Sequence, residues 1–230
     1  MPKRTKAIKK TDRGKAWLKK RNTTKYKIET KDLNKTILIV CEGQTEQLYF
    51  ESFPVLSLTV KVMNLGGQAK LKMIEITTDI IKNSQREYDE IWCVFDMDVN
   101  KGEKEFADFD NAIEKAKLQT PEYKVAYSND AFELWFYLHY NYTEQQNLRK
   151  FYYDALSTYW GINYVKEGKK YAFCMEIYNL LEKDSSVSQA EAIKRAEKLH
   201  KKQEHLVYHQ QNPITLVYPL VKLLNDNLRR

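Results

Sequence analysis

Two aspartates, separated by one residue, stand at the end of an unbroken apolar stretch. Residues 91–99 read Ile-Trp-Cys-Val-Phe-Asp-Met-Asp-Val, so five apolar residues lead directly into Asp96 and Asp98. A short apolar run without polar alternation predicts a strand buried on both faces. Residues two apart in a strand project from the same face, so we expect both carboxylates at the carboxyl edge of a sheet. Either a bound cation or protonation of one acid would relieve their mutual repulsion.

A third acid, Glu42, follows the apolar run of residues 36–41. Gly43 permits a tight turn from this strand into a helix that Pro54 ends. We therefore expect Glu42 at the same sheet edge as Asp96, where open α/β folds keep their ligand sites. Glu46 falls in the first turn of the helix, where the helix dipole favours an acid, and we interpret it as a helix-start residue.

The order of the predicted elements indicates an α/β fold with a four-stranded parallel sheet flanked by helices. Two more strands are expected at 58–65 and 123–127, and helices at 71–83 and 105–118 separate them. From residue 143 the pattern is helical, with helices expected near 144–160, 171–181, 189–205 and 214–228. We divide the chain into a basic flexible arm (1–35), an α/β domain (36–142) and a C-terminal helical extension (143–230) packed on that domain.

Several polar residues near predicted turns allow two interpretations. Gly66-Gly67 with Lys70 would suit a phosphate at a helix N-terminus, but such a pair is more often turn chemistry. Asp130 and Glu133 have the spacing of a capping box, and with equal weight Glu133 points instead into the crevice at the strand ends. We interpret His139 as a hydrogen-bonded core residue. Asn212-Pro213 has the form of a helix start.

The basic charge of the chain is concentrated at its N-terminus. The 230 residues carry a formal net charge of +7, with 38 Lys and Arg against 31 Asp and Glu. Residues 1–35 hold 14 of those cations and three of those acids, so the remaining 195 residues are slightly acidic. Cations in this arm, including Lys9, Lys10, Lys19, Lys20 and Arg21, either contact nucleic-acid phosphates or form a solubilising tail, and we weight the two equally.

The composition also indicates the cellular compartment in which we expect the protein. The sequence has no run of about 18 apolar residues and no apolar segment of the secretory type behind its basic start. Cys41, Cys93 and Cys174 are widely spaced and odd in number, which favours reduced core thiols over disulfides. We expect a cytoplasmic protein without a membrane contact.

The strand–Glu42–Gly43 motif followed by Asp96-Met97-Asp98 resembles the Toprim core of topoisomerases, primases and related nucleases. Longer segments resemble the RloB-like (AbiLii) family: residues 40–46 with Tyr49-Phe50, Ser128-Asn129 with Phe132-Glu133 and Trp135, and Asn212-Pro213 with Thr215. Asp130 departs from this pattern, in which proline is expected after Asn129.

These resemblances imply a Toprim-like fold in which Glu42, Asp96 and Asp98 hold one or two Mg²⁺ (or Mn²⁺) ions. Glu133 joins them as a candidate catalytic residue, with Gly43, Asn129, Asn212 and Thr215 as accessory groups. The RloB-like family is tied to phage defence, abortive infection and restriction–modification loci, commonly beside an ABC-type ATPase.

Two functional hypotheses follow. The first is an Mg²⁺-dependent Toprim-type nuclease that hydrolyses phosphodiesters of tRNA or DNA, because hard carboxylate oxygens suit Mg²⁺ and bound metal activates water. The second is a non-catalytic nucleic-acid-binding subunit that docks an ABC-type ATPase and nucleic acid through the basic arm. A phosphoacceptor receiver domain ranks last, since its paired acid and later lysine are missing, and a sugar-nucleotide transferase using the Asp-x-Asp pair has no further support.

Overall fold

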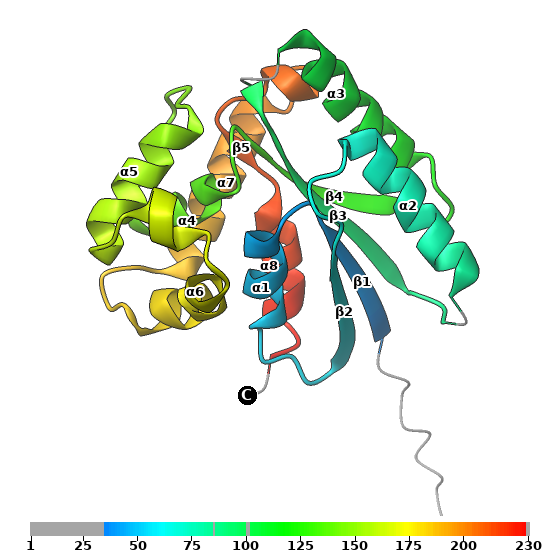
Figure 1. Ribbon diagram of the computed structural model, residues 1–230, viewed down its shortest axis with the longest axis horizontal. Coiled ribbons are helices and arrows are strands. Elements are labelled where there is room, and N and C mark those ends of the chain that lie inside the picture. The colour runs from blue at the N-terminus through cyan, green and yellow to red at the C-terminus, as the bar shows by residue number, and fades with distance from the viewer. Residues whose placement is uncertain (1–34, 85, 100–101, 229–230) are drawn as a thin grey trace, which may run out of the picture. The chain divides into compact units, whose positions relative to one another are not determined.

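The unbroken apolar runs form the central strands of a five-stranded sheet in the order β2-β1-β3-β4-β5 (Figure 1). The computed structural model describes residues 35–84, 86–99 and 102–228. Strands β1 to β4 are parallel, as predicted. The strands are β1 (Lys35–Cys41), β2 (Leu58–Asn64), β3 (Glu90–Met97), β4 (Tyr123–Asn129) and β5 (Ile214–Thr215).

Helices connect the parallel strands and then make up most of the chain beyond β4. The first four are α1 (Gln44–Glu51), α2 (Lys70–Asn83), α3 (Glu103–Lys117) and α4 (Glu133–Tyr140). The later ones are α5 (Arg149–Trp160), the short π-helix η4 (Tyr164–Gly168), α6 (Tyr171–Lys183), α7 (Gln189–Gln203), the 3₁₀ turn η5 (Tyr208–Gln210) and α8 (Val217–Asn225). Each helix expected from the periodicity between residues 71 and 205 is present, with shifted ends.

Alternation along β3 divides the core into two layers. Cys93 and Phe95 face α2 and α3 on one side of the sheet, whereas Trp92 and Val94 face the side that packs against α1 and α4 (Figure 1). Helices α5 to α8 contribute to this second layer, so the extension shares a hydrophobic core with the sheet. The described residues all belong to one compact unit.

The fifth strand corrects the predicted four-stranded, wholly parallel sheet. Ile214 and Thr215 pair antiparallel with Asn129 and Ser128, and the Ser128 and Thr215 hydroxyls are 2.8 Å apart. The helix predicted at 214–228 is therefore wrong over its first residues, because α8 begins only at Val217. Asn212-Pro213 forms a cis peptide before β5 and does not begin a helix. A two-residue strand is too short for a sequence pattern to reveal.

Two local predictions are confirmed. His139 is buried in α4 with its ring Nδ1 3.0 Å from the Trp135 carbonyl oxygen, so it is a hydrogen-bonded core residue. Cys41, Cys93 and Cys174 are buried thiols.

Within the described residues, no helix is both long and apolar enough to cross a membrane.

The N-terminus of α2 is occupied by a carboxylate of α3. The backbone N–H groups of Lys70 and Leu71 donate to the Asp108 carboxylate, at 2.7 and 3.3 Å. Gly66 and Gly67 both have positive φ, of 70° and 72°, which glycine adopts without strain. The glycine pair therefore forms a tight turn, and the Asp108 carboxylate occupies the helix N-terminus that a phosphate would need.

We expect Asp108→Ala to lower the free energy of unfolding by about 1–2 kcal/mol, because it leaves the first N–H groups of α2 without an acceptor. Urea denaturation of the full chain measures the change. Asp79→Ala, at an exposed position of the same helix, is the matched control. Equal effects of the two substitutions would contradict a capping role for Asp108.

Candidate functional site

Adjacent strands β1 and β3 deliver Glu42 and Asp96 to one pocket at the carboxyl edge of the sheet. The Glu42 backbone N–H donates to the Val94 carbonyl at 2.9 Å, which extends the strand pairing up to this acid. The pocket has a volume of about 330 Å³. It is lined by residues 42–46, Asn64, Gly66, Gly67, Asp96, Arg149 and Lys169.

Asp96 is held in place from the start of the segment that leads into α4. Its Oδ2 accepts a hydrogen bond from the Phe132 backbone N–H at 3.2 Å. Burial raises the pKa of the carboxyl, and Arg149 partly offsets this effect. Asp96 is therefore an acid whose charged form needs nearby positive charge.

Glu42 contacts a lysine that is almost completely buried. Lys70, the first residue of α2, is 1% exposed, and its Nζ lies 3.6 Å from Glu42 Oε1 and in a closer ion pair with Glu105 of α3. Burial alone would lower the pKa of Lys70, but Glu42 and Glu105 raise it above its usual value. The charged lysine therefore ties the end of β1 to both helices on the other side of the sheet.

Asp98 lies beyond the end of β3 and contacts an arginine of the extension. Arg149 Nη2 lies 3.4 Å from Asp98 Oδ1 and 3.3 Å from Asp130 Oδ1, and it donates to the Asp130 carbonyl oxygen at 3.0 Å. Asp98 is not among the residues that line the pocket, although its sequence neighbour Asp96 is. Asp96 also raises the pKa of Arg149. Arg149 therefore interacts with both Asp96 and Asp98.

Asp130 does not form the capping box that its spacing to Glu133 allows. Its carboxylate accepts hydrogen bonds from the backbone N–H groups of Val99, at 3.2 Å, and Arg149, at 2.7 Å. Helix α4 follows Phe132 without a side-chain cap. The capping-box alternative is therefore wrong, because this buried carboxylate joins the β3 exit to the start of α5 instead.

Glu133 is 1% exposed and is not among the residues that line the pocket. It accepts a hydrogen bond from the Tyr164 hydroxyl at 2.9 Å and pairs with the ammonium of Lys169. Burial would raise the pKa of Glu133, but the charge of Lys169 and these hydrogen bonds lower it below its usual value. Glu133 is therefore an ionised, buried counter-ion of Lys169.

Glu46 lies in the first turn of α1, as expected, and its side chain also lines the pocket. Burial, and next the charge of Asp96, raise its pKa from 4.5 to about 8. A Cβ atom on Gly43 would come within 2.7 Å of Glu46 Oε2, so the glycine leaves room for this carboxyl. Interpreting Glu46 only as a helix-start acid missed its burial beside Asp96.

Three predicted accessory residues gather around β5 instead of the pocket. The Asn129 amide donates to the carbonyl oxygens of His209, at 3.2 Å, and Gln211, at 2.9 Å. Thr215 pairs with Ser128, and the Asn212 carbonyl accepts from Gln203 at 3.2 Å. Of the accessory set, Gly43 alone is a lining residue. The predicted phosphate contacts Lys9, Lys10, Lys19, Lys20 and Arg21 lie outside the described residues.

The cations at this edge were not identified from the sequence as members of the site. Lys70 was considered only beside the glycine turn, Lys169 falls in a segment that separates two helices, and Arg149 carries no motif. Their partners lie far away along the chain: Arg149 and Asp130 are 19 residues apart, and Lys169 and Glu133 are 36 apart. Motifs defined by the spacing of neighbouring residues do not indicate pairs that lie this far apart in the sequence.

The donor set suits a hard divalent cation, although the acids do not converge. Contacts and electrostatic interactions connect seven carboxyl groups (Glu42, Glu46, Asp96, Asp98, Glu105, Asp130 and Glu133) with three cations (Lys70, Arg149 and Lys169). In the part of the chain that is described, no three His, Cys, Asp or Glu side chains form a group that could hold a metal ion. Mg²⁺ needs only one or two carboxylates because it keeps several waters. The excess of carboxylate oxygens fits such an ion, and Glu42 and Asp96, the two predicted metal ligands that line the pocket, are the residues that would hold it.

Comparison with known proteins agrees with the resemblance seen in the sequence. A model of the RloB-like protein family matches residues 37–224, a span that includes the sheet and most of the extension. No curated protein and no solved structure matches the chain.

The raised pKa of Glu46 makes stability depend on pH. The folded chain keeps its proton up to about pH 8, whereas the unfolded chain releases it near pH 4.5, so folding binds a proton in this window. Stability should therefore fall as pH rises through it, with a slope of up to about 1.4 kcal/mol per pH unit from this group. Glu46→Gln should remove that contribution.

The measurement is urea denaturation of both proteins in EDTA between pH 6.5 and 8. Burial lowers the pKa of His139 from 6.5 to about 4, so His139 gives a slope of opposite sign only below this range. Glu51→Gln, on the exposed side of the same helix, controls for loss of one carboxylate. Parallel stability curves for wild type and Glu46→Gln would contradict the assignment.

Proposed function

The chain belongs to the RloB-like protein family, and from that premise we propose that it is an Mg²⁺-dependent nuclease of Toprim type. Its proposed substrates are the phosphodiesters of tRNA or DNA, and its proposed setting is phage defence, through abortive infection or a restriction–modification locus. The observation that supports this most strongly is one pocket lined by Glu42 and Asp96 together with Arg149 and Lys169. Acids that can hold a divalent ion, beside cations that can contact a phosphate, suit metal-assisted phosphodiester hydrolysis.

The residues of the chain have separate tasks in this proposal. Glu42 and Asp96 would hold the ion, and Asp98 would join them or hold a second ion. When bound, the ion would polarise the phosphate and lower the pKa of a water molecule. Lys70 positions Glu42, and the Phe132 N–H positions Asp96. The electrostatic link between Asp96 and Arg149 keeps the acid beside a group that can contact the phosphate.

A second candidate is a non-catalytic nucleic-acid-binding subunit that partners an ABC-type ATPase. One observation favours it: Lys70 and Arg149 already neutralise Glu42 and Asp98, and the described acids form no three-ligand group. In that case the ion pairs would be structural, and binding would depend on the arm at residues 1–35.

We expect Asp96→Asn to lower Mg²⁺-dependent cleavage of a tRNA and DNA mixture by about 100-fold or more, because it removes a charged ligand without changing the shape of the side chain. Gel analysis of the products measures this, and isothermal titration with Mn²⁺ should show weakened metal binding in parallel. Asp79→Asn, an exposed acid of α2, is the control and should change neither.

Cleavage that survives the double substitution Asp96→Ala and Asp98→Ala would remove the metal role. A wild-type chain that neither cleaves nor binds Mn²⁺, but loses nucleic-acid binding when residues 1–35 are deleted, would favour the second candidate.

A further inference from the structure

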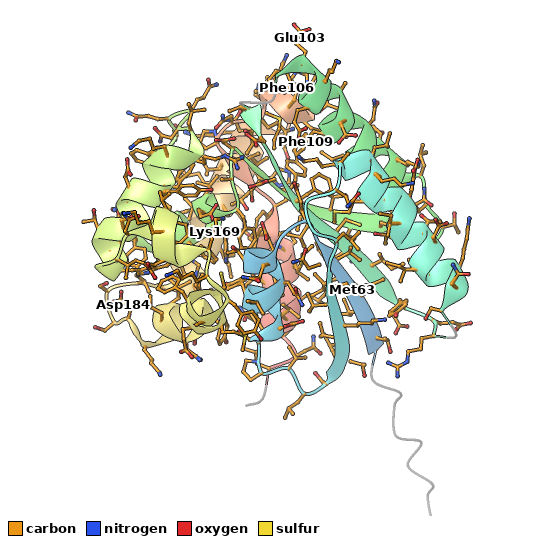
Figure 2. The ribbon with its side chains drawn as sticks, viewed as in Figure 1. Met63, Glu103, Phe106, Phe109, Lys169 and Asp184 are labelled. Atoms are coloured by element: carbon orange, nitrogen blue, oxygen red, sulfur yellow. The ribbon has the colours of Figure 1, made fainter. Side chains whose placement is uncertain are left out.

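Both cations that line the pocket come from the helical extension rather than from the α/β domain. Arg149 is the first residue of α5, and Lys169 lies between η4 and α6. The ionisable acids of the lining, Glu42, Glu46 and Asp96, belong to the β1–α1 segment and β3. Figure 2 shows Lys169 on the side of the extension that faces α1, and its carbonyl accepts a hydrogen bond from Gln44 Nε2 at 3.3 Å. The pocket therefore has acids on its sheet side and cations on its extension side.

Arg149 is held in place, and a quarter of its side-chain surface is still exposed, at 25%. Its backbone N–H and its Nη2 both donate to Asp130, which is fully buried. Its Nε is buried and makes no hydrogen bond to any described residue. Arginine is the residue most suited to phosphate recognition because its planar head presents several fixed donors. The contacts with Asp130 therefore anchor the head, and the exposed part of the side chain lines the pocket.

Lys169 is held by a buried carboxylate but remains reachable from solvent. Its ammonium pairs with Glu133 and lies 5.4 Å from the ring centroid of Tyr153 and 5.9 Å from that of Tyr164. The side chain is nevertheless 45% exposed. An ammonium group has three N–H donors, so the pair with Glu133 leaves others for a ligand. A cation needed only to neutralise Glu133 would not have to line an open pocket.

We propose that Arg149 and Lys169 bind the substrate phosphate, so that the helical extension completes a site begun by the sheet. This deepens the proposed nuclease function and rests on it, since the phosphate is the one that the acids opposite would act on. The two cations are phosphate-binding residues, and the group that they bind is a phosphodiester of a nucleic-acid strand.

The test compares Lys169→Gln in two backgrounds, wild type and Glu133→Gln. The probe is a short fluorescent single-stranded oligonucleotide, and Ca²⁺ replaces Mg²⁺ to prevent hydrolysis of the probe. Fluorescence anisotropy at several salt concentrations gives the affinity and its salt dependence. Lys170→Gln is the matched control, because this neighbouring lysine is exposed, forms an ion pair with Glu167 and does not line the pocket.

We expect Lys169→Gln to weaken binding roughly tenfold in both backgrounds, as for loss of a charged phosphate contact. The slope of log affinity against log salt should decrease by about 0.7, the value for one phosphate contact with a single strand. Lys170→Gln should change the slope much less. Lys169→Arg keeps the charge and should retain most of the affinity.

Each alternative outcome has a distinct meaning. If Lys169 only neutralises Glu133, Lys169→Gln will leave the affinity unchanged in the Glu133→Gln background, which overturns the inference while the nuclease proposal stands. A wild-type chain that binds no oligonucleotide would remove both. Should Lys169→Gln alone fold poorly because Glu133 is left unpaired, the double variant, which has no unpaired charge at this position, still gives the answer.

Discussion

Compensation of buried carboxylates by cations is the constraint on which this sheet edge depends. Ionised acids are costly to bury unless they are paired, and the edge holds more acids than cations. Lys70, Arg149 and Lys169 supply the positive charge, each from a different helix or connecting segment. At Glu46, burial and the charge of Asp96 outweigh the opposing effect of Lys169, so the pKa of this carboxyl is raised and it keeps a proton instead. The ion pairs therefore stabilise a crevice that the acids alone would destabilise.

The same pairs explain why the extension and the sheet form one unit. Asp130, at the end of β4, binds the first residue of α5, and Glu133, in α4, binds Lys169 before α6. Removing one member of a buried ion pair is far more costly than the net contribution of the pair, because it leaves a charge uncompensated. Charge pairing at the edge thus adds to the hydrophobic layer that α5 to α8 share with α1 and α4.

A divalent ion and these cations would serve the same electrostatic purpose. Glu42 and Asp98 are each within 4 Å of a cationic nitrogen, and an arriving Mg²⁺ would add charge to a site that still has surplus carboxylates. Phosphate would bring negative charge of its own, which Arg149 and Lys169 are placed to meet. In the nuclease proposal, metal and substrate therefore favour each other's binding. In the alternative proposal, the existing pairs are sufficient and the pocket needs no ion.

The sequence by itself determined the parallel strands β1 and β3, because apolar runs buried on both faces give a clear local pattern, and it placed Glu42 and Asp96 at their carboxyl ends. It also indicated the family, through motifs spread from residue 40 to residue 215. Only the tertiary structure decided which cations face these acids, that Asp130 anchors α5, that Glu46 is buried, and that Ile214–Thr215 adds a fifth strand. Those features depend on contacts between residues distant in the chain, and periodicity and capping motifs report only on neighbours.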